Sequence, residues 1–186
     1  MMIPKLITKP VTVLGIDPST KATGIVLLQE NGGLPPLVLH EREVSPGEHK
    51  GCLRLSDIVT AIMETIHGLK PDKLVIEGYS LNLKNKTSVI PLVELGGVLR
   101  FMLYLDGLKW YEPRASEVKK FATGSGNSPK DKVMMHVFKR WGHEPATNNT
   151  ADAYVLAAMG LAQVNRLHGV TLEMRGIAGA MSARCN

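Results

Sequence analysis

LGIDPSTKATG, residues 14–24, joins a run of apolar residues to a polar turn through a single acid. The run from Val11 to Ile16 is rich in β-branched and apolar residues, which is typical of a strand buried on both faces. Asp17 stands at the exit of this run, and a second apolar run follows from Ile25 to Leu28. The pattern predicts a hairpin whose first strand presents a carboxylate at its end.

The same pattern recurs in KLVIEGY, residues 73–79, where another short apolar strand ends in an acid, Glu77. Two such strands side by side would bring both carboxylates to one edge of a sheet. Carboxylate oxygens are preferred ligands of hard divalent cations, so the two strand ends predict a metal site. Taken singly, each acid has an ordinary explanation. Asp17 could form an Asx turn before Pro18, and Glu77 could be an exposed acid at a strand end.

A third acid, Asp152, stands within ADAYVLAA, residues 151–158, where a helix has apolar residues on almost every side. Burying a charge there is costly unless a cation or a donor compensates it, so Asp152 is the candidate third ligand. Asn149, three residues earlier, would lie on the same helix face and could add a carbonyl oxygen. The alternative is that Asn149 caps the helix and Asp152 is its third-position partner.

Around these acids, the sequence predicts three strands followed by alternating helices and strands. Turn residues separate the predicted strands 11–16, 24–30 and 37–44 into an antiparallel meander. Apolar spacing predicts the later elements, which are helix 53–66, strand 74–76, helix 88–105, strand 109–112 and helices 115–121, 130–141 and 150–165. A right-handed crossover would place the fourth strand beside the first. The predicted class is therefore α/β, with a mixed sheet of three antiparallel and two parallel strands flanked by helices.

Length and composition are those of a soluble globular protein, with 186 residues of which 44% are hydrophobic. Residues 1–168 are expected to form one domain, and the sequence assigns no structure to the tail 169–186, which could be flexible. The apolar runs are too short to span a membrane, and no membrane partner is expected. Cys52 and Cys185 have no metal-type spacing, and residues 1–10 lack the pattern of a signal peptide. A cytoplasmic location is therefore expected.

The positive charge of the chain is concentrated in one segment. Between Lys109 and His143, eight Lys and Arg residues stand against three Asp and Glu residues, and the rest of the chain is balanced. A basic segment beside an acidic metal site is what an enzyme acting on phosphodiesters needs. A solvated helix surface has the same composition, so charge alone leaves both interpretations open.

Taken together, these motifs resemble the RuvC family of Holliday junction resolvases, within the RNase H-like nuclease superfamily. The resemblance covers residues 11–160 and rests on four motifs that occur in the same order and spacing as in the family. The first is GIDPS with TG (15–19 and 23–24), and the second is VIE (75–77). The third is VK with GSG and KDKV (118–119, 124–126 and 130–133), and the fourth is ADA (151–153). It departs at Asn149, where the family commonly has Asp or His, and at Ser80, where an aromatic residue is common. Tyr79 or Tyr104 could replace that aromatic residue. These departures suggest a divergent or phage-encoded member.

The resemblance implies a metal-dependent endodeoxyribonuclease that resolves four-way DNA junctions by paired symmetric nicks. It implies two Mg²⁺ ions, for which Mn²⁺ could substitute, held by Asp17, Glu77 and Asp152 with Asn149 as a further ligand. It also implies that Lys130 stabilises charge on the cleaved phosphate. The implied DNA-binding residues are Lys119, Lys120, Lys132, Ser125 and Tyr79.

The family also implies a homodimer, because two sites related by a two-fold axis match a two-fold substrate. Helix 88–105 offers apolar surface for this contact, although burial within the monomer would explain most of its residues equally well. The sequence does not identify a motor partner.

Other functions are compatible with the same motifs. A nucleotide-binding phosphotransferase also carries Gly-Ile-Asp followed by a later glycine, but it needs two lobes of this fold, and 186 residues supply one. A junction-binding protein without catalysis fits the neutral Asn149 but not three intact acids. A related nuclease acting on RNA or on a broader range of branched DNA would differ in surface loops that the motifs do not specify.

Overall fold

The computed structural model describes residues 9–79, 86–181 and 183–184. Within these residues, six strands form one mixed sheet in the order β3-β2-β1-β4-β5-β6. They are β1 (Thr12–Asp17), β2 (Thr23–Asn31), β3 (Leu34–Val44), β4 (Lys73–Ile76), β5 (Trp110–Tyr111) and β6 (Ala183–Arg184). The first three strands are antiparallel neighbours, whereas β4 is parallel to β1 and β5 to β4. The predicted sheet, with its fourth strand beside the first, is confirmed.

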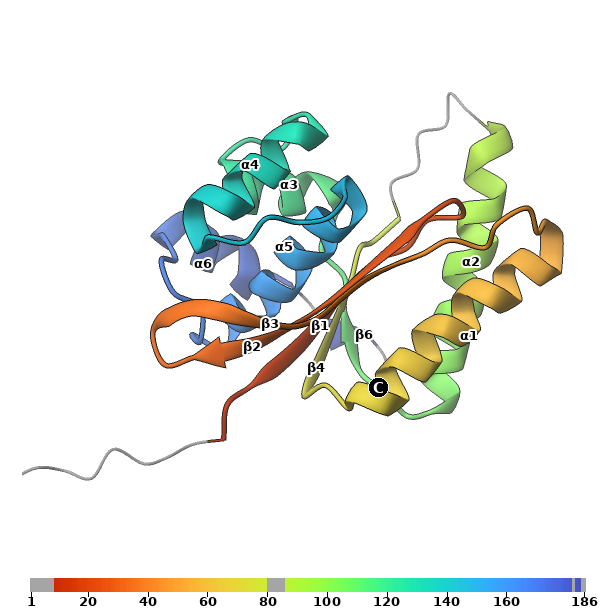
Figure 1. The fold of residues 1–186 in the computed structure, drawn as a ribbon, viewed down its shortest axis with the longest axis horizontal. Coiled ribbons are helices and arrows are strands. Elements are labelled where there is room, and N and C mark those ends of the chain that lie inside the picture. Colours follow the sequence, from red (N-terminus) through yellow and green to blue (C-terminus); the bar gives the residue numbers. More distant parts are fainter. Residues whose placement is uncertain (1–8, 80–85, 182, 185–186) are drawn as a thin grey trace, which may run out of the picture.

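Helices cover both faces of the sheet (Figure 1). One layer consists of α1 (Gly51–Leu69) and α2 (Lys86–Leu105), and the other of α3 (Ala115–Thr123), α4 (Lys130–Trp141), α5 (Asn148–Gln163) and α6 (Leu172–Gly179). Successive side chains of a strand point to opposite faces, which produces two separate cores. On β1, Leu14 and Ile16 join the core with α1 and α2, whereas Val13 joins the core with α5.

The chain after Gly169 has regular structure that the sequence does not predict. In α6, Met174 and Ala178 are buried in the α5 core. The hydroxyl of Thr171 caps this helix by accepting a hydrogen bond from the Met174 amide (3.2 Å). β6 then pairs with β5 in the antiparallel sense, so the sheet has one strand more than predicted. A short helix containing Gly176 has too weak a periodic signal to be predicted without its packing partner.

Glycines on the sheet allow α5 to lie directly against β1 and β2. A Cβ on Gly15 would stand 2.0 Å from the Ala153 carbonyl oxygen, and one on Gly24 would stand 2.1 Å from the Asn149 carbonyl oxygen. Both distances are far inside van der Waals contact, so no other residue fits at either position without moving the helix. The glycines of the opening motif therefore hold the start of α5 over the ends of β1 and β2.

Most predicted boundaries agree with the structure. Helix 130–141 matches α4 at both ends, whereas helix 150–165 begins two residues later than α5. In the described part of the chain, no helix is both long enough and apolar enough to cross a membrane. Cys52 is an exposed free thiol, and Cys185 lies outside the described residues.

Candidate active site

The two acids at the strand ends meet between β1 and β4. These strands are parallel, with Ile16 opposite Ile76, so Asp17 and Glu77 are the next residues in line. The Glu77 amide donates a hydrogen bond to the Ile16 carbonyl (3.0 Å) and extends this pairing. The Asp17 and Glu77 carboxyl groups are close enough to share a hydrogen bond. In α/β sheets, ligand crevices form where the strand order reverses, and β1 and β4 mark that point here.

Asp152 approaches these two acids from α5. Its side chain is almost wholly buried, at 6% exposure, and its charge acts on both Asp17 and Glu77. Burial is the largest cause that raises the pKa of Asp17 well above its usual value, and repulsion by Glu77 and Asp152 raises it further. Burial also raises the pKa of Glu77 and that of Asp152. Burial and mutual repulsion therefore oppose the ionisation of all three carboxyl groups. A bound cation would stabilise their charged forms.

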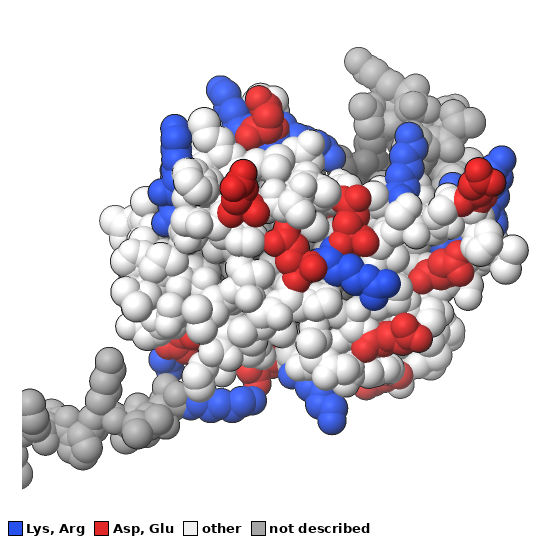
Figure 2. All heavy atoms as spheres, in the orientation of Figure 1, with Lys and Arg blue, Asp and Glu red and all other residues white. Residues whose placement is uncertain are grey.

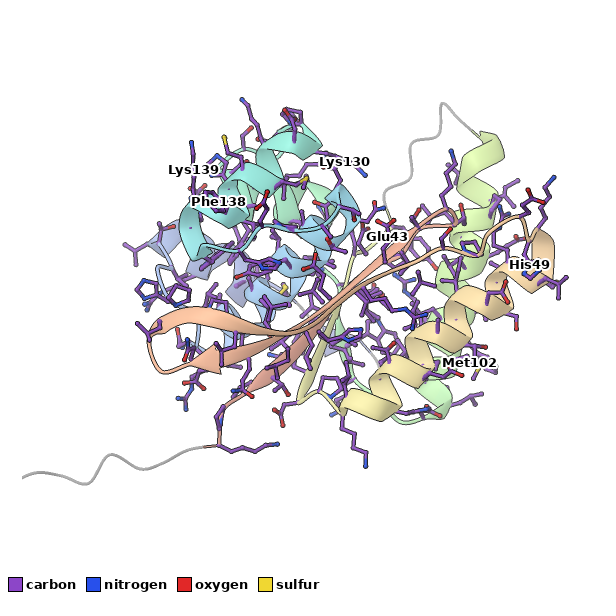
Figure 3. The ribbon with its side chains drawn as sticks, in the orientation of Figure 1. Glu43, His49, Met102, Lys130, Phe138 and Lys139 are labelled. Carbon is purple, nitrogen blue, oxygen red and sulfur yellow. The ribbon has the colours of Figure 1, made fainter. Side chains whose placement is uncertain are left out.

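Two lysines partly offset the repulsion among the acids. The charges of Lys130 and Lys119 lower the pKa of Glu77 and that of Asp152, although burial has the larger, opposite effect. Figure 3 shows Lys130 projecting from the start of α4 on the side that faces α2. Both lysines were predicted from the sequence, and the structure brings their charge to the acids.

A cavity of about 330 Å³ lies over this group. Its walls include Asp17, Glu77, Lys130 and Asn149, together with the turn 18–21 and part of α2. The turn is closed by its own side chains, since the Ser19 amide donates to the Thr23 hydroxyl (3.1 Å). The predicted metal ligands and the predicted catalytic lysine therefore come together at one end of the sheet.

The donors at this site fit a hard divalent cation. They are carboxylate and amide oxygens, which suit Mg²⁺ or Mn²⁺ better than softer metals. Among the described residues, no three His, Cys, Asp or Glu side chains converge on a point where one ion could sit.

The start of α5 differs from the alternative that Asn149 caps the helix. Thr147 is the N-cap, because its hydroxyl accepts a hydrogen bond from the Thr150 amide (3.2 Å). The Thr147 amide in turn donates to the Thr150 hydroxyl (3.0 Å), which completes a capping box. That alternative is therefore wrong. The side chain of Asn149 instead donates from Nδ2 to Oε2 of Glu43 on β3 (3.0 Å).

Residues predicted to bind DNA occupy different environments. Lys119 is half-buried beside the acids, whereas Lys132 on α4 and Ser125 in the α3–α4 loop are exposed. Lys120 pairs with Glu173 of α6 (3.1 Å). That ion pair could not be foreseen, because the sequence assigns no helix to this part of the chain.

Tyr79 lies against α2. The Arg100 guanidinium stacks on its ring (4.1 Å), and a Cβ on Gly96 would stand 2.5 Å from the same ring. Arg100 also pairs with Glu112, which links this contact to the chain after β5. Tyr79 is 40% exposed, so part of its ring is accessible beside Glu77. Ser80, where the family commonly has an aromatic residue, lies outside the described residues.

Two acids on β3 near the site were missed by sequence reasoning. Glu41 accepts hydrogen bonds from His143 Nε2 (2.9 Å) and from the Ala146 amide (2.9 Å). Glu43 accepts from the Thr147 hydroxyl (2.5 Å) as well as from Asn149. The alternation of HEREV, residues 40–44, places both acids on one face of the strand. Nothing in that pattern indicates that the start of α5 lies opposite them.

An α/β sheet of this topology, with acids from two adjoining strand ends and from a helix packed on them, defines the chain as an RNase H-like nuclease. The family model described as "Crossover junction endodeoxyribonuclease RuvC" matches residues 13–160. The chain therefore belongs to the RuvC family of crossover junction endodeoxyribonucleases.

Individual relatives agree with this assignment. The chain is 30% identical over 147 residues to the crossover junction endodeoxyribonuclease RuvC of Moorella thermoacetica, covering 78% of this chain and 87% of that protein. The corresponding protein of Brachyspira hyodysenteriae is 31% identical over 144 residues, covering 77% and 89% of the two chains.

Solved structures show the same fold. RuvC of Thermus thermophilus superposes with a TM-score of 0.68 at 21% identity, covering 84% of this chain and 98% of that one. The structure of T. thermophilus RuvC in complex with a Holliday junction substrate superposes with a TM-score of 0.69 at 19% identity, with the same coverage.

Proposed function

We propose that this protein is a metal-dependent endodeoxyribonuclease that resolves four-way DNA junctions by paired symmetric nicks. The observation that carries the proposal is that Asp17, Glu77 and Lys130 line one cavity, while the charge of the buried Asp152 acts on both of these acids. A pure DNA-binding protein gains nothing from clustered negative charge near phosphates. Membership of the RuvC family supports the same reaction.

The roles of the side chains follow from their positions. Asp17, Glu77 and Asp152 would hold Mg²⁺ or Mn²⁺, which supplies an activated water and stabilises charge at the scissile phosphate. Burial and mutual repulsion raise the pKa of Asp17, so a bound cation would favour its ionised form. Lys130 lines the same cavity and would balance negative charge that develops on the phosphate in the transition state.

The surface of α4 can hold the DNA backbone. Burial lowers the pKa of His136, and the charges of Arg140, Lys139 and Lys132 lower it further, which supports an electropositive surface on this helix. Lys and Arg side chains line the edge of the molecule near α4 in Figure 2, and Figure 3 shows Lys139 pointing away from the core. Phosphate contacts of this kind position DNA without reading its sequence and weaken as salt increases.

A homodimer would provide two such sites, and α2 offers a surface for it. Six apolar side chains of this helix are at least 40% exposed, and they lie along one side of it. These residues are Ile90, Val93, Val98, Phe101, Tyr104 and Leu105. Monomeric proteins rarely expose a continuous apolar stripe, so we propose that a second copy covers it. A two-fold dimer would present its two sites to two of the four strands of a four-way junction.

The test is cleavage of a labelled synthetic four-way junction beside a fork, a linear duplex, a single strand and an RNA–DNA hybrid. Each substrate is incubated with Mg²⁺, Mn²⁺ or EDTA. The proposal predicts paired symmetric nicks in the junction with either metal and none in EDTA. Equal cutting of the fork would contradict the proposal and indicate a nuclease that acts on branched DNA in general. Cutting of the hybrid alone would replace it with an RNA nuclease, and binding without cutting would overturn catalysis.

A further inference from the structure

Glu43 lies on β3 outside the group of acids, yet it contacts a residue that lines their cavity. We infer that Glu43 is a positioning residue, which orients the side-chain amide of Asn149 so that the carbonyl oxygen Oδ1 serves the metal site. The inference rests on the proposed function, because it assigns a neutral ligand to the same site. It goes further by explaining how an asparagine can act where a carboxylate or an imidazole is common.

The orientation of the amide follows from hydrogen-bond chemistry. An ionised carboxylate only accepts hydrogen bonds, and an asparagine side chain has one donating end and one accepting end. Nδ2 of Asn149 lies 3.0 Å from Oε2 of Glu43, so the donating end faces Glu43. The accepting end, Oδ1, must then face away from Glu43. Without the carboxylate, the amide could rotate and present either end to the cavity.

The register of the sheet places Asn149 between Glu43 and Asp17. Asp17 pairs with Gly24, and Gly24 pairs with Glu43, so the three residues form a row across β1, β2 and β3. The backbone of Asn149 lies directly over Gly24, in the middle of the row. Its Nδ2 is directed to Glu43 at one end, and Asn149 is also one of the residues that line the cavity containing Asp17 at the other. Asn149 therefore bridges β3 and the site.

Glu43 is itself held in place by the start of α5. The same oxygen that accepts from Asn149 also accepts from the Thr147 hydroxyl (2.5 Å). Because Thr147 is the N-cap of α5, the carboxylate is tied to the backbone that carries both Asn149 and Asp152. Partners that orient a ligand from behind contribute strongly to metal affinity in other metal sites.

The identity of residue 149 is also explained by this contact. A carboxylate at that position would lie against the carboxylate of Glu43, and like charges at hydrogen-bond distance repel. An amide avoids the repulsion and still supplies an oxygen ligand. Glu43 and Asn149 thus form a matched pair, in which changing one member changes what the other can do.

The experiment is calorimetric titration of the full chain with Mn²⁺ alone, without DNA. In Glu43→Gln, the glutamine amide can donate as well as accept, so the Asn149 amide loses its fixed orientation. We expect the Mn²⁺ dissociation constant to rise about tenfold, the lower end of the range for such supporting contacts. Glu41→Gln is the matched control. It removes an acid that holds the start of α5 through His143 and Ala146, and we expect its Mn²⁺ affinity to stay within about twofold of wild type.

The double variant Glu43→Gln/Asn149→Asp tests the pairing itself. A carboxylate at position 149 presents an oxygen in either orientation, and the new glutamine can donate to it. We expect this variant to regain at least wild-type Mn²⁺ affinity. The single variant Asn149→Asp should melt at a lower temperature than wild type without metal, because its carboxylate faces Glu43.

Unchanged Mn²⁺ affinity in Glu43→Gln would overturn the inference, even if the variant melts at a lower temperature. Failure of the double variant to regain affinity would overturn it too. The variant Asp17→Asn tests whether Mn²⁺ binds at this site. If wild type and Asp17→Asn bind Mn²⁺ equally well, the inference about Glu43 is also overturned. The junction assay is independent. A protein that binds Mn²⁺ as described but does not cut the junction would contradict the proposed function and leave the role of Glu43 standing.

Discussion

On one face of the sheet, α1 and α2 pack through large aliphatic side chains such as Ile58, Ile62 and Leu99. On the other face, α5 packs with its backbone almost on the strands, over Gly15 and Gly24. The acids gather on the second face. A layer of interdigitated side chains can adjust when one of them changes, whereas two backbones in contact have little room to move. The close-packed face is therefore the one that can hold Asp152 in a fixed place relative to Asp17.

The largest expected effect comes from adding a methyl group beneath α5. In Gly15→Ala, the Cβ would stand 2.0 Å from the Ala153 carbonyl oxygen, and neither backbone can rotate away. We expect a loss of roughly 3–5 kcal/mol in the free energy of unfolding, measured by urea denaturation. The control on the other layer is Gly68→Ala in α1, where a Cβ meets nothing within 4 Å. That variant should gain up to about 1 kcal/mol. Similar losses in both would show that the faces do not differ.

A second comparison contrasts two lysines on the close-packed side. Lys130 lies beside the acids, whereas Lys120 pairs with Glu173. Lys130→Ala should slow junction cleavage by about 100-fold, which is typical for loss of a group that stabilises transition-state charge. Lys120→Ala should change the rate by less than about threefold, because Lys120 pairs with Glu173 and saturating enzyme removes any effect on DNA binding. Single-turnover kinetics at saturating enzyme measures both. Equal losses would mean that distance from the acids does not decide the role of a lysine.

The acids should make the metal-free protein less stable at neutral pH. The pKa of Asp17 is raised in the folded state, so its contribution to stability is complete below the ordinary value of 3.8 and is lost as the pH rises through the raised pKa. Asp17→Asn removes this loss, and we expect it to raise the free energy of unfolding of the metal-free protein at pH 7.

Thermal denaturation in EDTA across a pH series measures this effect. The difference between Asp17→Asn and wild type should grow as the pH rises and vanish in acid. Added Mn²⁺ should stabilise wild type but not the variant. A variant that is less stable than wild type at pH 7 without metal would contradict the proposed electrostatic conflict.

The smallest effect is expected on the face packed by α1 and α2. Ile58 is fully buried there, and Ile58→Val removes one methyl group. We expect a cost of about 1 kcal/mol in stability, measured by urea denaturation. Mn²⁺ affinity and junction cleavage should remain at wild-type values. A change in metal affinity would show that this face also sets the geometry of the site.

Most of the fold and the three acids could be predicted because their signals are local. Buried strands that end in Asp17 and Glu77, and an acid in an apolar helix at Asp152, are visible as patterns over a few residues. The crossover rule then places the fourth strand beside the first without any further information. Local pattern and general topology together were enough to bring the acids to one end of the sheet.

What could not be predicted depends on contacts between distant segments. The bond from Asn149 to Glu43 spans 106 residues, and that from Lys120 to Glu173 joins α3 to a helix with no clear periodic signal. Thr147 caps α5 although Asn149 is an equally good capping residue by type. Glu43 of β3 accepts hydrogen bonds from both Thr147 and Asn149, and no pattern near residue 147 indicates that this strand lies there.

The most direct test of the account is to compare wild type with Asp17→Asn and Asp152→Asn on one labelled four-way junction in Mg²⁺. The two acids come from opposite sides of the β1–α5 contact, so a shared metal site requires both. The account predicts paired symmetric nicks by the wild type, and a loss of at least 100-fold in the cleavage rate in each variant while junction binding persists. Cleavage by Asp152→Asn at the wild-type rate would contradict it.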